Sequence, residues 1–190
     1  MEGWFDRLKV CLLLSAALFL GSMVAGWLVG LLSPEFTEGF VEGLGEGFGW
    51  LRGQPRYVLT MVILINNAGK CLGAVLLGPL FGLAPLGLSV VNGFVLGLVA
   101  FVVGSERGVT FLAASLLPHG VFEVPALLVS VAAGLWEGWL MVKKLSGEPV
   151  SLLGALRDGL RLYFRVALPL LVVAAFVEGY VTPEVMRLVP

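Results

Sequence analysis

One short stretch, residues 118–125, carries residue types that can do chemistry inside an otherwise apolar sequence. It contains His119, the only histidine of the chain, and Glu123, four positions later. Side chains four positions apart lie on one face of an α-helix, so this imidazole and this carboxylate are expected within reach of each other. Such a pair can bind a cation or pass protons. Because ionisable side chains are costly at membrane depth, we interpret the pair as a candidate functional site.

The same stretch contains signals against a regular helix. Pro118 and Pro125 bracket the pair, and each proline removes a backbone donor and disfavours the helical conformation of the residue before it. Gly120 lies between them. The apolar residues 109–117 that lead into Pro118 are too few to cross a bilayer. The sequence therefore predicts a broken or re-entrant helix near Pro118.

Composition places this stretch in a membrane protein. Apolar residues make up 58% of the 190 residues, and the mean hydropathy is +0.99. Charged residues make up only 13%, against about 25% in a soluble domain. The formal net charge is −1, and there is no basic run, so the sequence gives no reason to expect nucleic acid as a partner.

Apolar segments predict an all-α, polytopic membrane helix bundle that forms a single transmembrane domain over residues 1–190. A helix needs roughly 20 apolar residues to cross the hydrocarbon core, and the first segment is longer than the apolar region of a signal peptide, about 7–15 residues. We expect about five transmembrane helices, over residues 10–32, 57–81, 86–103, 119–142 and 166–181. In the third, Gly93 and Gly97 form a small-xxx-small pattern, which is common where helices pack.

Two further segments have the pattern of amphipathic helices at the membrane surface. Residues 33–56 carry an acidic residue every four positions, at Glu38, Glu42 and Glu46. Residues 145–165 carry a basic stripe with the same spacing, at Arg157, Arg161 and Arg165.

The distribution of basic residues predicts an orientation. With the N-terminus inside, the cytoplasmic segments would hold seven Lys and Arg residues and the outer segments four. We therefore expect a multi-pass protein of the cell membrane with its N-terminus in the cytoplasm and its C-terminus outside. This orientation brings five polar residues to a similar depth in the outer half of the membrane, and we predict that they form one polar cluster: Asn66, Asn67, His119, Glu123 and Glu178.

Three strings of the sequence resemble those of the stage II sporulation protein M family. They are the Pro-His-Gly-Val-Phe-Glu string of residues 118–123, the pair Asn66-Asn67, and residues 176–183, Phe-Val-Glu-Gly-Tyr-Val-Thr-Pro. The resemblance covers nearly the whole chain. It implies a multi-span protein, and the sporulation member belongs to a complex that remodels septal peptidoglycan with a second membrane protein and a wall hydrolase. Carried over to this sequence, the family signature falls on Asn66, Asn67, Pro118, His119, Gly120, Glu123, Glu178 and Pro183.

The common catalytic motifs are missing from the sequence. A helical zinc-protease motif needs two histidines, and this chain has one. Ser115 and Ser130 lie near His119 in sequence but lack the context of a nucleophile elbow. The many glycines lie in apolar helices and not in a phosphate-binding loop after a strand. We therefore expect that the protein is not an enzyme.

Three functions remain open from the sequence. The first is a small channel or transporter in which His119, Glu123 and Glu178 bind a cation or relay protons. A metal cation held by His119 and Glu123 would need more ligands, which a homodimer or other homo-oligomer would supply. The second is a non-transporting scaffold in the lipid bilayer that recruits membrane-protein partners. The third is the permease subunit of an ATP-driven transporter, with residues 150–165 as the coupling surface. A water-accessible cavity leading to His119 would favour the first.

Overall fold

A computed structural model describes residues 2–47, 49–51 and 53–189, with side chains from Arg7 on. These residues form helices and no strand, which confirms the predicted all-α class. Arg52, one of the four outer basic residues of the predicted topology, lies outside the described ranges. The elements are α1 (Glu2–Leu32), α2 (Pro34–Gly47), η1 (Gly49–Leu51), α3 (Arg56–Leu76), α4 (Leu83–Leu145), α5 (Leu152–Leu162), η2 (Tyr163–Ala167), α6 (Leu168–Phe176), η3 (Val177–Val181) and α7 (Thr182–Arg187).

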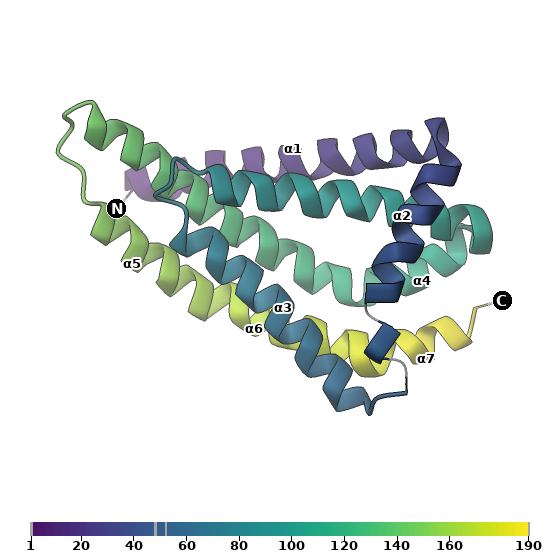
Figure 1. Ribbon diagram of the computed structural model, residues 1–190. Helices are drawn as coiled ribbons and strands as arrows, with labels where there is room; N and C mark the ends of the chain where they lie inside the picture. The colour runs from purple at the N-terminus through teal and green to yellow at the C-terminus, as the bar shows by residue number, and fades with distance from the viewer. Residues whose placement is uncertain (1, 48, 52, 190) are drawn as a thin grey trace.

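Helix α4 doubles back on itself. In the described part of the chain, four helical segments are long and apolar enough to cross a membrane: Arg7–Leu32, Arg56–Leu76, Leu83–Leu145 and Leu152–Arg187. The third has 63 residues, about three times the roughly 20 that one crossing needs. Figure 1 shows that it runs out along α1, turns, and returns. We call residues 83–107 the outgoing arm and residues 109–145 the returning arm. Four long helices thus make five passes through the bundle.

The turn between the arms lies at Gly108, and the predicted break near Pro118 is wrong in position. Gly108 has φ 81° and ψ 167°, and it is the non-helical residue inside α4. This backbone region is accessible almost only to glycine. Pro118, Gly120 and Pro125 all lie within the continuous helix of the returning arm. Each proline removes only one backbone donor, and a packed membrane helix tolerates that loss.

A tight turn also ends α3 earlier than predicted. The predicted second span continued to residue 81, but α3 ends at Leu76. Phe81 and Gly82 then adopt positive φ angles, 58° and 71°, and α4 begins at Leu83. This turn directs the outgoing arm back toward the other end of the bundle, as Figure 1 shows.

Glycines bring α1 into backbone contact with the outgoing arm. A Cβ atom added to Gly26 would overlap the carbonyl oxygen of Phe94, and one added to Gly97 would overlap that of Met23. Gly93 is enclosed in the same way by α1. The small-xxx-small pattern of Gly93 and Gly97 is therefore used for packing within the chain.

Buried polar side chains link the passes. Ser15 of α1 donates to the carbonyl of Leu128 on the returning arm at 3.2 Å. Ser89 of the outgoing arm donates to the carbonyl of Ser15, also at 3.2 Å. The buried Tyr163 hydroxyl donates to the carbonyl of Ala68 at 3.1 Å and so joins η2 to α3. These bonds satisfy groups that hydrocarbon cannot.

Residues 152–187 form one long helical segment with two π-helical stretches, η2 and η3. At their ends, the N–H of Leu168 bonds to the Tyr163 carbonyl and that of Thr182 to the Val177 carbonyl, each five residues back. Each of these donors is followed by a proline, Pro169 or Pro183. A proline cannot donate a helical hydrogen bond, and the wider π turns come just before both prolines. The second π turn contains Glu178.

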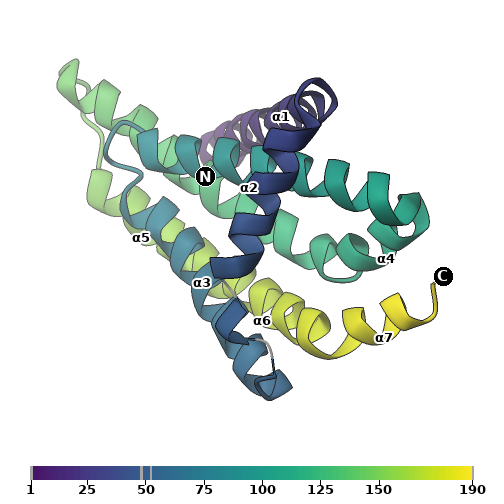
Figure 2. The same ribbon diagram turned by 45° about the vertical axis from the view of Figure 1, so that its right-hand side comes forward.

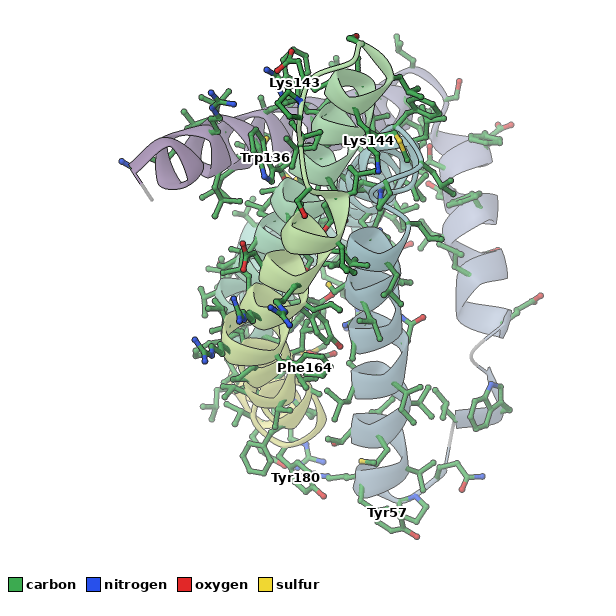
Figure 3. All side chains as sticks on the ribbon, turned by 90° about the vertical axis from the view of Figure 1, so that its left-hand side faces the viewer. Tyr57, Trp136, Lys143, Lys144, Phe164 and Tyr180 are labelled. Carbon is green, nitrogen blue, oxygen red and sulfur yellow. The ribbon has the colours of Figure 1, made fainter. Side chains whose placement is uncertain are left out.

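The remaining elements lie toward the ends of the bundle. Helix α2 runs across the direction of α1 and the outgoing arm (Figures 1 and 2), consistent with the predicted interfacial helix. The two termini lie at opposite ends in Figure 1. Lys143 and Lys144, at the end of the returning arm, lie far from Tyr57 and Tyr180 in Figure 3.

The position of the turn can be tested by comparing two substitutions. We expect Gly108→Ala to lower the free energy of unfolding by about 1–3 kcal/mol, because alanine is strained in this backbone region. Pro118→Ala should cause no loss, because it restores a donor within a continuous helix. Reversible unfolding in mixed micelles measures both. A larger loss for Pro118→Ala than for Gly108→Ala would contradict a turn at Gly108.

Candidate functional site

The structure joins two of the predicted site residues directly. Nδ1 of His119, on the returning arm, lies 2.6 Å from Oε2 of Glu178 in η3. The two side chains are 17% and 31% exposed, and the two contacting atoms themselves are buried. Neither atom has a well-aligned hydrogen-bond partner among the described residues. Each is therefore compensated mainly by the other.

The short separation bears on the protonation of this pair. An unprotonated Nδ1 and an ionised carboxylate would present lone pairs to each other at 2.6 Å. A proton carried by the imidazole or by the carboxyl relieves this repulsion. The contact is thus a candidate position for a proton between two passes of the bundle.

Close packing of the π turn against α3 positions Glu178. The next residue, Gly179, is buried, and a Cβ atom added there would overlap the hydroxyl of Thr60 on α3. Thr60 is in turn held by its bond to the Arg56 carbonyl at 3.0 Å. One turn further on, Glu184 of α7 accepts from the Arg56 guanidinium at 2.7 Å. Backbone approach and this exposed ion pair hold η3 beside α3 while Glu178 reaches the returning arm.

Glu123 lies one helical turn from His119 and is partly buried. It is close enough to His119, Glu178 and Lys70 for their charges to act on it. Cys71, next to Lys70, lies within hydrogen-bonding reach of Ser130. The structure thus brings His119, Glu123 and Glu178 near one another. The direct contact of His119 is with Glu178, and not with Glu123, its neighbour on the same helix.

The two asparagines form a hydrogen bond with each other. The amide of Asn66 donates to the side-chain oxygen of Asn67 at 3.1 Å. Neither makes a described hydrogen bond to His119 or Glu178. Asn66 is exposed on α3, near the middle of the helix. Its place in the predicted cluster thus stays a prediction.

A metal site is not built from the described residues. No group of three or more His, Cys, Asp or Glu side chains among them is arranged to hold a metal ion. His119 and Glu123, which the sequence offered as metal ligands, would need donors from another chain.

The two hollows described on the surface lie elsewhere. One is lined by α5 and η2 residues, including Arg157 and Phe164, and the other by α1 and the end of the returning arm, including Cys11 and Trp136. Neither contains His119 or its partner carboxylate.

Two features of the structure have only faint signals in the sequence. The sequence signal of the π turn around Glu178 is Pro183, five positions later, which cannot donate a helical hydrogen bond. The second is Glu137, a buried carboxylate at the far end of the returning arm. Its signal is helical spacing, because His119, Ser130 and Glu137 fall on one face of an α-helix.

Comparisons with known proteins give the following matches. The model of the family described as stage II sporulation protein M matches residues 15–183. Uncharacterized protein MJ0793 of Methanocaldococcus jannaschii is 32% identical over 127 residues, which cover 65% of this chain and 70% of that relative. Uncharacterized protein MJ0706 of the same organism is 27% identical over 134 residues, 68% of this chain and 58% of that relative. No solved structure matches the chain.

The contact between His119 and Glu178 predicts energetic coupling. In a double-mutant cycle with His119→Ala and Glu178→Gln, we expect an interaction free energy of about 0.5–3 kcal/mol, measured by reversible unfolding in mixed micelles. The exposed pair Arg56 and Glu184 serves as the reference and should couple more weakly, because solvent screens it. Additive effects of the two site substitutions would show that the contact does not form.

Proposed function

Because the chain belongs to the stage II sporulation protein M family, whose members span the membrane several times, we propose that it is a membrane protein that handles protons at an intramembrane site. The site consists of His119, Glu178 and Glu123. The observation that carries the proposal is the contact of 2.6 Å between His119 and Glu178. It supports a proton held between the returning arm and the π turn of residues 177–181.

Three features support protons over other cations. All three groups are titratable, and imidazole is the side chain that changes charge most readily near neutral pH. The described residues do not build a set of three metal-ligating side chains. The charge of Lys70 also acts on Glu123 and would repel a bound cation. A proton needs only the groups that are present.

The imidazole gives the site a route as well as a binding position. When Nε2 of a ring that carries its proton on Nδ1 accepts a second proton, the imidazolium can pass the Nδ1 proton to the Glu178 carboxylate, so a proton enters on one side of the ring and leaves on the other. Glu123, one turn along the returning arm, is the next acceptor. The proposed proton route therefore runs along the returning arm through the bundle. In the predicted orientation it runs from the outer side of the cell membrane toward the cytoplasm.

The π turn supports a functional role for Glu178. Single π turns in helices occur often at functional sites. Here the wider turn places a carboxylate opposite His119, while Gly179 allows α3 to pack behind it. We propose this binding and transfer role, and no catalytic one.

An organising role is the second candidate, and the surface of α3 favours it. Asn66 and Lys70 are exposed there near the middle of the helix, where hydrocarbon offers no hydrogen bonds. Gly69 and Gly73 lie beside them, and the space above both is open. A second copy of the chain would cover this face, because an amide both donates and accepts and so can pair with its own equivalent across a two-fold axis. Such a homo-oligomer could also recruit membrane-protein partners or an ATPase.

Proton flux into proteoliposomes tests the first candidate. With a pH gradient across the vesicle membrane, we expect the native protein to conduct protons and so dissipate the gradient. His119→Ala and Glu178→Gln should reduce the rate to that of protein-free vesicles. Glu38→Gln, which removes an exposed carboxylate of α2, should leave the rate unchanged. Folding and incorporation of each variant are matched by size-exclusion chromatography and protein content.

Native protein that leaves the gradient intact would contradict proton conduction. The organising role would then be the better account, and the oligomeric state in the bilayer would be the next measurement.

A further inference from the structure

A second carboxylate lies at the other end of the returning arm. Glu137 is 1% exposed, and neither of its carboxylate oxygens has a hydrogen-bond partner in the described part of the chain. It lies about five helical turns beyond His119, on the same face of the returning arm. This burial is unusual, because a carboxylate without a partner is among the most costly groups to bury.

Glycines from two other elements enclose the carboxyl group. A Cβ atom added to Gly78, in the turn after α3, would lie 2.5 Å from Oε2 of Glu137. One added to Gly159 of α5 would overlap Oε1. Gly134, one turn earlier on the returning arm, lies against Gly78 as well. Backbone from two other elements therefore encloses the carboxyl group, and α5 covers one side of it.

The electrostatic surroundings give an ionised carboxylate no support. The carboxyl group is shielded from water by burial, and no described charged group lies close enough to act on it. Gly78 directly follows the C-terminal end of α3, which carries partial negative charge and disfavours an anion.

The charged side chains of the neighbouring elements have other contacts. Arg7 of α1 lies over the Trp136 ring, Asp158 of α5 pairs with Arg161, and Lys143 of the returning arm pairs with Glu148. Lys70 of α3 is exposed.

The enclosure also decides which ligand the carboxyl can take. A metal cation needs several ligands, and among the described residues no group of three or more His, Cys, Asp or Glu side chains could hold one. A proton adds no volume and removes the charge. We propose that Glu137 is a second proton-binding site, and that its protonation holds α5 in contact with the α3–α4 turn.

The proposal makes the docking of α5 dependent on protonation. An ionised Glu137 would require water, and water can enter only if α5 or the turn at Gly78 moves away. Helix α5 is short, and its buried contact residues are Ala155 and Gly159. This inference goes beyond the function proposed above, because it concerns a different carboxylate and a movement of α5 that does not depend on His119.

Two readouts on the full-length protein in lipid nanodiscs test the proposal. The first is the infrared C=O band of protonated carboxyl groups at neutral pH. We expect Glu137→Gln to remove one carboxyl contribution from this band, because the substitution replaces the carboxyl with an amide, which does not absorb there. His119→Ala should leave that contribution in place, which separates this test from that of the proposed function. A band unchanged by Glu137→Gln would overturn the proposal.

The second readout is the distance between spin labels at Leu153→Cys on α5 and Leu83→Cys at the start of α4, two exposed positions. All samples carry Cys11→Ala and Cys71→Ala, which removes both native thiols. As pH rises into the alkaline range, the distance distribution should shift to longer values when Glu137 is present and stay fixed in Glu137→Gln. Glu148→Gln, a control on an exposed carboxylate, should keep the shift. A distance that is independent of pH with Glu137 present would overturn the proposal even if the variant failed to fold.

Discussion

The hydrocarbon core of a bilayer offers no hydrogen bonds, and this constraint accounts for most of the structure. It requires that each backbone polar group be satisfied within its own helix, so the described residues are helical. It requires the buried hydroxyls to find carbonyls on other passes, as Ser15 and Ser89 do. It also explains why the buried atoms of His119 and Glu178 lie against each other. The same constraint leaves Glu137, which has no partner in the described part of the chain, with protonation as the simplest way to lose its charge.

Glycine residues allow the passes of the bundle to come into backbone contact, because a glycine has no side chain that would hold the neighbouring helix away. Gly97 brings the outgoing arm against α1, Gly179 brings the π turn against α3, and Gly159 brings α5 against Glu137. In the last two cases the close approach lies directly at a carboxylate. The packing of the bundle and the positions of its titratable groups are thus parts of one arrangement.

The apolar runs of the sequence predicted the helices well, because length and hydropathy alone decide whether a segment can cross. The third predicted span ended at residue 103, close to the turn at Gly108, but the apolar runs could not show that a continuous returning helix begins directly after this turn. Proline is the stronger breaking signal in a sequence, yet the prolines at 118 and 125 are absorbed within the returning arm. The partner of His119 was equally hidden, since spacing along one helix favoured Glu123, whereas the contact with Glu178 depends on how two distant passes pack.

The presence of a single histidine allows the most direct test of the shared proton. Protein labelled with nitrogen-15 in its imidazole, measured by solid-state NMR in lipid bilayers, reports on His119 alone. We predict an Nδ1 signal typical of a nitrogen that shares a proton with a carboxylate, and we expect Glu178→Gln to shift it toward that of an ordinary neutral imidazole. Identical spectra for the native protein and Glu178→Gln would contradict the shared proton, and with it the proposed site.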